Sequence, residues 1–301
     1  MRITSNMIGA QQMAALQSNI QLMSKASQQV TSGKRLTQAS DDPTAATSIM
    51  ESASSLRALD QYKTNVQRAS SRVGMEDSVL QQLGNILTRA KELGLSQAGG
   101  TSDSQSRSVA NAEVQQLFQQ IVSLGNTKLG DEYLFGGSQT QTAPFAATGN
   151  GATLDYTTTT PQGQRSIQIG DGQTLAVAHD GKQMMLDTGV LDAVKQLSRA
   201  LDPASTTYGD DGISAAMTSL DGAFNAVQTL VGDVGAQGKQ LDSTQANLDA
   251  YKTNLTTFKS DLEDVDIETA VTELTNRQVA YQAAMLATSK VMGLTLADYL
   301  K

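Results

Sequence analysis

A heptad pattern in the last part of the chain constrains the fold more than any other feature of the sequence. Within residues 266–300, apolar and small polar residues recur at alternating spacings of four and three. The positions are Ile267, Val271, Leu274, Gln278, Tyr281, Met285, Thr288 and Met292. This alternation is typical of a helix that packs lengthwise against another helix. Gln278 and Thr288 interrupt the apolar face, which suits a helix that stays soluble until it is paired.

A matching pattern lies at the other end of the chain. A first helix, capped by Thr4 or Ser5 and stopped by Gly33, would carry Met13, Leu16, Ile20, Met23, Ser27 and Val30 on one face. Residues 1–40 hold four basic side chains and no acid, whereas residues 261–301 hold seven acids and three bases. We therefore expect the terminal helices to be partners, the alternative being that each packs on its own neighbour. The pattern leaves open whether they pair within one chain or between chains.

The apolar members of both patterns are the candidate assembly residues. They are Met13, Leu16, Ile20, Met23, Val30, Ile267, Val271, Leu274, Tyr281, Met285 and Met292.

Heptad patterns between the two ends predict further long helices. The predicted helices span about 43–97, 103–128, 191–201 and 213–255. Asp42 and Pro43 are a suitable N-cap and first-turn pair for the first of these. Ser260 and Glu263 have the spacing of a capping box, which predicts that a new helix begins near Asp261.

The stretch 138–188 differs from the helical segments in composition. It is rich in Thr, Gly and Gln, and it shows the alternation typical of short strands. The predicted strands are 153–158, 165–169 and 174–179, with Gly170-Asp171-Gly172 as a turn. This stretch therefore predicts a small β-rich insert domain.

The predicted fold is mainly α with a small β-rich insert. It is an elongated rod of long antiparallel coiled-coil-like helices, with the N- and C-terminal helices paired at one end. The expected divisions are a terminal helical domain from 1–42 and 260–301, a rod domain from 43–137 and 189–259, and the insert domain at 138–188.

The sequence offers little to build an enzyme or a cofactor site. His179 is the only histidine and the chain has no cysteine, so we predict no catalytic residues, no metal site and no cofactor. The net charge of −8 argues against nucleic acid as a partner, because no basic stripe is present. No apolar run is long enough to predict a membrane span, and residues 1–30 lack the pattern of a cleaved signal peptide.

Several motifs resemble those of the flagellin superfamily. They are Met1-Arg2-Ile3-Thr4, Ser32-Gly33-Lys34-Arg35-Leu36 and Ser40-Asp41-Asp42-Pro43 near the start, and 261–274 and 294–300 near the end. The resemblance covers about 1–135 and 210–301, and it leaves the insert unmatched. Tyr133-Leu134-Phe135-Gly136-Gly137-Ser138 and Leu296-Ala297-Asp298-Tyr299-Leu300 look more like the superfamily's hook–filament junction branch than like filament flagellins.

The resemblance implies a structural, non-enzymatic and extracellular part of the bacterial flagellum. Such a subunit would be exported by the flagellar type III apparatus without a cleaved signal peptide. A ring of like subunits would join the hook, through the other junction protein, to the first flagellin. A cytoplasmic chaperone would hold the C-terminal helix before export.

Two other functions stay open at the level of the sequence. The first is filament flagellin itself, which would polymerise without limit. The second is a binding module in the β insert, which would act on the surface of the assembly. For the insert alone, a solvent-exposed surface domain without a ligand is the simpler interpretation.

Overall fold

The computed structural model describes residues 5–99, 102–159, 161–163, 165–177 and 179–299, with side chains except at 5, 6, 8, 9, 165 and 290–299. The chain divides into two compact units. The terminal unit comprises the residues up to Ala58 and from Ala250 onward, and the central unit comprises Leu59–Asp249. Within the described residues there are six α-helices and three two-stranded sheets. The expected mainly α fold with a small β-rich insert is confirmed.

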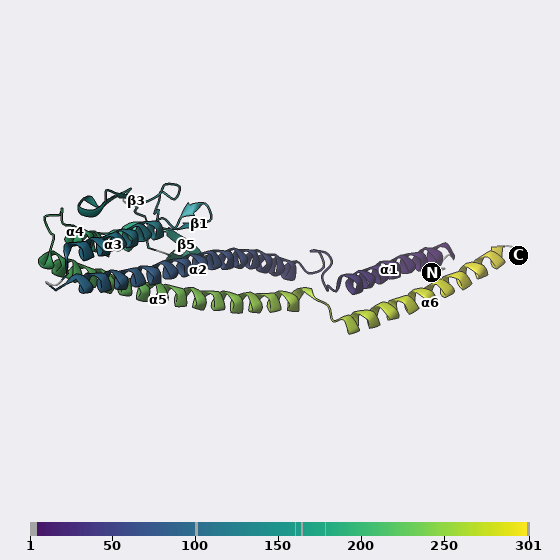
Figure 1. Ribbon diagram of the computed structural model, residues 1–301. Helices are drawn as coiled ribbons and strands as arrows, with labels where there is room; N and C mark the ends of the chain where they lie inside the picture. The colour runs from purple at the N-terminus through teal and green to yellow at the C-terminus, as the bar shows by residue number, and fades with distance from the viewer. Residues whose placement is uncertain (1–4, 100–101, 160, 164, 178, 300–301) are drawn as a thin grey trace. The chain divides into compact units, whose positions relative to one another are not determined.

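The terminal unit pairs the two ends of the chain. Helix α1 (Ser5–Ser32) and helix α6 (Ile267–Tyr299) lie side by side and run in opposite directions (Figure 1). The expected pairing of the terminal helices is therefore confirmed, and here it forms within one chain. Gly33 follows α1 with a φ of 67°, a left-handed conformation that glycine adopts without strain and that ends the helix.

The central unit is built on two antiparallel helices: α2 (Pro43–Gln97) from Leu59 onward, and α5 (Asp210–Glu263) up to Asp249. Lys63 of α2 forms an ion pair with Asp249 of α5, and Lys91 forms one with Asp221. The residue nearer the C-terminus of α2 is thus paired with the residue nearer the N-terminus of α5, as expected for antiparallel helices. The heptad positions of α2 supply the core, and the buried ones are Leu59, Val66, Ala69, Val73, Glu76, Leu80, Leu83, Leu87 and Ala90.

Helices α3 (Ser104–Gly125) and α4 (Val190–Leu201) pack on each other in the central unit. Asp103 caps α3 by accepting the backbone N–H of Ser106 at 2.7 Å. Burial of Val114, Phe118 and Ile121 on α3 and of Val190, Val194 and Leu197 on α4 completes the core. The predicted end of α3 near residue 128 is wrong, because the chain leaves the helix at Gly125 to form a hairpin.

The predicted start of the last helix near Asp261 is also wrong. Helix α5 continues through Ser260 to Glu263, and the Ser260 hydroxyl donates to Asp264 instead of capping a new helix. Helix α6 begins only at Ile267. Its cap is Asp266, which accepts the backbone N–H of Glu268 at 3.1 Å and the Thr269 hydroxyl at 2.8 Å.

Three antiparallel hairpins form in place of one sheet, the first of them before the insert and the other two within it. The pairs are β1 (Lys128–Leu129) with β2 (Glu132–Tyr133), β3 (Phe145–Thr148) with β4 (Asp155–Thr158), and β5 (Arg165–Gly170) with β6 (Gln173–Val177). The sequence predicted β4, β5, β6 and the turn between the last two, but not β1, β2 or β3. A 3₁₀ turn (Gly151–Thr153) and a π-helix (Lys182–Leu186) complete the insert.

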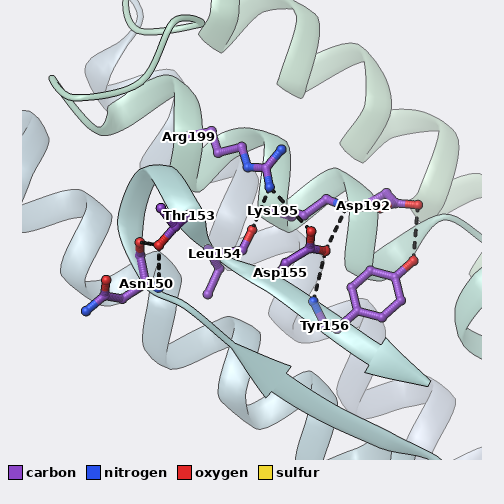
Figure 2. Close-up of polar contacts among 8 residues, drawn as sticks. All are labelled: Asn150, Thr153, Leu154, Asp155, Tyr156, Asp192, Lys195 and Arg199. Carbon is purple, nitrogen blue, oxygen red and sulfur yellow. Dashed lines mark hydrogen bonds and ion pairs between the residues drawn. The ribbon is translucent and has the colours of Figure 1, made fainter. Parts of the chain in front are cut away.

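A polar network fastens the second hairpin to α4 (Figure 2). Lys195 lies 3.3 Å from the Asp155 carboxylate and 2.6 Å from that of Asp192. Arg199 donates to the carbonyl of Leu154 at 3.0 Å, and the Tyr156 hydroxyl donates to Asp192 at 3.4 Å. Charge and hydrogen bonding therefore hold β4 against a helix of the central core.

No α-helix in the described part of the chain is long and apolar enough to cross a membrane.

Candidate assembly surface on the terminal helices

A backbone clamp joins the end of α1 to the start of α6. The backbone N–H of Arg35 donates to the carbonyl of Glu263 at 2.7 Å, and that of Val265 donates to the carbonyl of Gly33 at 3.0 Å. The Arg35 guanidinium also donates to the carbonyl of Leu262 at 2.8 Å. The two backbone hydrogen bonds run in opposite directions between the segments, as in an antiparallel strand pair. They fix the axial register of the two helices at this end.

Opposite charges meet at the same clamp. Lys34 forms an ion pair with Glu263, which also lies 3.3 Å from Lys259. The hydrogen bond from Lys34 is the main reason that the pKa of the Glu263 carboxyl lies below its ordinary value. The basic N-terminal part of the sequence and the acidic C-terminal part therefore form an ion pair at the clamp.

The connector between α1 and α2 is folded by two adjacent aspartates. Asp41 accepts hydrogen bonds from the Lys25 ammonium at 2.7 Å and from the backbone N–H groups of Thr37 and Gln38 at 3.2 Å. Asp42 caps α2 by accepting the backbone N–H of Ala45 at 3.1 Å. Asp41 thereby folds the connector back onto α1, while Asp42 starts the next helix.

The other two connector residues have simpler surroundings. Pro43 is the first residue of α2, where its missing N–H costs nothing. Ser40 is exposed, and its hydroxyl donates to the side-chain oxygen of Gln38 at 3.4 Å.

Asp41 is expected to titrate far below an ordinary aspartate. The hydrogen bond from Lys25 is the largest cause, and it lowers the pKa of Asp41 from 3.8 to about 2. Because the folded pKa is depressed, this carboxylate stabilises the connector above roughly pH 4, and the contribution is lost as the pH falls toward 2. The amide resonances of Thr37 and Gln38, followed by NMR against pH, should show a midpoint near 2 that moves up in Lys25→Gln. A wild-type midpoint near 3.8 would contradict this contact.

The contact face between α1 and α6 is narrow and partly polar. Among the described side chains of α1, those that are not exposed are Gln12, Leu16, Asn19, Met23, Ala26, Gln29 and Val30. Among the described side chains of α6, they are Ala270, Glu273, Leu274, Arg277, Tyr281, Ala284 and Thr288. Among the described side chains of these two helices only Ala26 and Ala270 are fully buried. Such a pair buries little apolar surface by itself.

The contact face is rotated relative to the expected one. Leu16, Met23 and Val30 on α1, and Leu274 and Tyr281 on α6, lie in it as expected. Five other expected contact residues lie beside it and stay 40–49% exposed: Met13, Ile20, Ile267, Val271 and Met285. At the contact, Gln12 and Asn19 take the places of Met13 and Ile20, and Ala270 and Ala284 take those of Val271 and Met285. Met292 belongs to α6, but its side chain is outside the described residues.

The five displaced side chains lie on one side of the helix pair. Most of them directly follow a contact residue in sequence, as Met13 follows Gln12 and Met285 follows Ala284. At about 100° per residue, each such position projects sideways from the contact face. Because both helices are right-handed and run in opposite directions, this sideways direction is the same for both. We call Met13, Ile20, Ile267, Val271 and Met285 the lateral strip.

The register of the pair brings two members of the lateral strip, Met13 and Met285, to about the same level along the helices. Met13 and Met285 each lie twenty residues from the hydrogen-bonded pair Gly33 and Val265, so they face solvent together. Val271 lies level with Ser27 by the same count, and Ile20 lies level with Gln278. Of these three levels, only that of Met13 and Met285 has an apolar side chain on both helices, so the lateral strip is not continuous.

Other exposed apolar residues of the terminal unit escaped the heptad analysis. Val279 and Leu286 point away from the contact face of α6 and are 60% and 66% exposed. Tyr251 and Phe258 are exposed near the end of α5, seven residues apart and thus on one helix face. The scarcity of aromatic residues in this chain, with seven Tyr and five Phe, was a signal that could have drawn attention to this pair.

The described residues contain no group of three or more acidic or histidine side chains that could hold a metal ion. The single histidine, His179, belongs to the central unit and lies beside a buried glutamate, Glu76.

Comparison with known proteins identifies the family. The model of the bacterial flagellin N-terminal helical region matches residues 3–140, and that of the C-terminal helical region matches residues 217–300. Flagellar hook-associated protein 3 of Escherichia coli (strain K12) is 26% identical over 312 residues, which cover 98% of each chain. A flagellin of Halalkalibacterium halodurans is 28% identical over 273 residues, which cover 89% of this chain and 88% of that protein.

The fold also matches a solved structure. The flagellar hook associated protein-3 from Legionella pneumophila superposes with a TM-score of 0.62 at 14% identity, over 71% of this chain and 98% of that one. The family matches cover the paired terminal helices, α2, α3 and most of α5, and they leave most of the insert outside. This chain belongs to the bacterial flagellin superfamily.

Proposed function

We propose that this chain is a structural subunit of the bacterial flagellum that joins the hook to the filament. The relative called flagellar hook-associated protein 3 covers 98% of both chains, whereas two flagellin matches cover 89% and 95% of this chain. The role needs a surface that binds several neighbours, and it needs no catalytic group.

The distribution of exposed apolar side chains carries the proposal. Of fifteen large hydrophobic side chains that are exposed among the described residues, twelve lie in the terminal unit. The other three are Leu95, Val109 and Tyr208 of the central unit. The terminal unit holds only about a third of the chain. Exposed apolar side chains gathered in this way are typical of a surface that becomes buried on association.

The terminal pair suits a subunit that completes its packing only in an assembly. The contact between α1 and α6 sets their register, and the lateral strip, with Val279 and Leu286 on the far side of α6, is left for neighbouring chains. We infer that these neighbours are like subunits in a ring, the other junction protein on the hook side, and flagellin on the filament side. Before assembly, a chaperone bound to α6 and export through the flagellar type III apparatus would keep these apolar surfaces from binding other subunits.

Deletion of the gene tests this function. Cells without the subunit should make hooks that carry no filament, with flagellin released into the medium, and the full chain supplied from a plasmid should restore filaments. Electron microscopy of the cells and analysis of the medium report the two results. Filaments of normal number and length on the deletion cells would contradict the proposal.

Filament flagellin is the second candidate, because the identity to a flagellin is as high as that to hook-associated protein 3. Purified protein added to short filament seeds distinguishes the two. A flagellin should extend the seeds into filaments many times their length, whereas a junction subunit should add without continued growth.

A further inference from the structure

A buried glutamate of α2 holds the segment that follows strand β6. Glu76 is 0% exposed, and its carboxylate accepts the backbone N–H of His179 at 3.1 and 3.3 Å. The ring Nδ1 of His179 lies 2.6 Å from the same carboxylate. Within the described residues, the hydrogen-bond donors to this carboxylate all belong to His179. A buried carboxylate needs such compensation, because an unpaired charge in the interior is strongly destabilising.

His179 begins a short segment to which other parts of the insert are attached. The backbone N–H of Gly181 donates to the carbonyl of Phe135 at 3.0 Å, and that of Lys182 donates to the carbonyl of Pro161 at 3.1 Å. Asp180 accepts the backbone N–H of Gly163 at 3.1 Å. The contact between His179 and Glu76 thus connects the base of the insert to α2.

The charges that face His179 are mostly acidic. Glu76 faces it from α2, Asp233 from α5, and Asp180 is the next residue. Asp187 lies in the same groove as His179 and Asp233 and is paired with Lys182. The hydrogen bond from Glu76 is the largest cause that raises the pKa of His179 above 6.5, and burial of the ring acts against it.

We propose that His179 and Glu76 form a proton-linked latch that closes the base of the insert on α2. With His179 protonated, the pair neutralises the buried carboxylate and residues 179–182 are held closed. Loss of the proton leaves the Nδ1–H and backbone hydrogen bonds but removes the positive charge, so this segment opens more often. This inference does not depend on the proposed function.

The sign of the pH dependence follows from linkage. Because the folded pKa of His179 is raised, the latch is at full strength below about pH 6.5, the pKa of a free histidine, and it weakens as the pH rises through the folded value. Each unit by which the closed state raises the pKa corresponds to roughly a tenfold increase in the ratio of open to closed molecules on full deprotonation.

Two measurements on the unmodified full-length protein test the latch. NMR titration of the single histidine gives its folded pKa, which should lie above 6.5. Hydrogen exchange at the Gly181 and Lys182 amides, corrected for the intrinsic effect of pH on exchange, should show protection that falls across the same titration. The fold-change in protection should match the fold-change implied by the pKa. A histidine pKa at or below 6.5, or protection that does not change with pH, would overturn the proposal.

Variants separate the charge from the hydrogen bonds. Glu76→Gln keeps the shape of the side chain and removes the negative charge, so the histidine pKa should fall below the wild-type value. His179→Gln should make protection at Gly181 and Lys182 independent of pH. Asp77→Asn, a change of charge at the next residue, is the matched control and should leave both results near wild type. If Glu76→Gln does not fold, the wild-type measurements alone decide.

Discussion

Replacing the lateral strip with glutamine, at Met13, Ile20, Ile267, Val271 and Met285 together, is expected to abolish filament attachment while the isolated protein stays folded. These side chains are 40–49% exposed, so in the free chain each substitution should change stability by no more than about 0.5 kcal/mol. Glutamine has high helix propensity and keeps α1 and α6 helical. The measurements are swimming in soft agar, electron microscopy of the cells, and circular dichroism of the purified variant.

The expected size of the effect comes from burial on assembly. Full burial of a large aliphatic side chain contributes about 1.5–3 kcal/mol, and these are already half-buried, which leaves roughly 1 kcal/mol each. Five such losses weaken each subunit contact by roughly three to four orders of magnitude in affinity. Repetition around a ring multiplies the loss, so partial attachment is not expected.

A second variant tests whether removing exposed apolar side chains anywhere in the protein has the same effect. Leu95 and Val109 of the central unit are 62% and 64% exposed, and their replacement with glutamine should leave cells motile. If the lateral strip variant swam normally with filaments attached, these five side chains would not be assembly contacts. If both variants lost motility, the effect would not be specific to the terminal unit.

Deletion of residues 266–301 is expected to remove more helix than the deleted segment contains. Without α6, helix α1 has no partner, and most of the stability of a helix in a protein comes from packing of its amphipathic face rather than from helix propensity. Circular dichroism should therefore show the loss of α6 and most of α1, and hydrogen exchange along α1 should become unprotected. Cells that carry the truncated chain should have hooks without filaments.

The central unit controls for general unfolding in this truncation. It has its own core, including Leu83, Phe118 and Val194, which are completely buried, so its thermal transition should be retained. Continued protection of α1 in the truncated chain would show that α6 is not its partner. A filament attached to cells with the truncated chain would show that α6 is not needed for assembly.

The heptad analysis located the helices well because their apolar positions recur over many turns. It predicted the ends of α2 and α4 closely, and the buried positions of α2 follow the predicted pattern. The ends near Gly125 and Ser260 were wrong because backbone hydrogen bonds that no heptad pattern encodes decide them. Backbone pairing in the β1–β2 hairpin ends α3 early, and the clamp between Arg35 and Glu263, 228 positions apart in sequence, sets the break before α6.

The contact face of the terminal helices shows what a sequence pattern leaves undetermined. Apolar side chains at Met13 and Ile20 mark a face that avoids water, but they do not say which partner covers it. In a single chain Gln12 and Asn19 take the contact instead, and Met13 and Ile20 turn outward. The His179–Glu76 contact was missed for another reason, because no local pattern relates a helix residue to one 103 positions later.

The position of the subunit along an intact flagellum tests the central claim most directly. An epitope inserted in the exposed turn at Asp171, between β5 and β6, avoids both the core and the terminal helices. Gold-labelled antibody viewed by electron microscopy should mark one band where the hook meets the filament. Label spread along the filament, or absent from the boundary, would contradict a junction role.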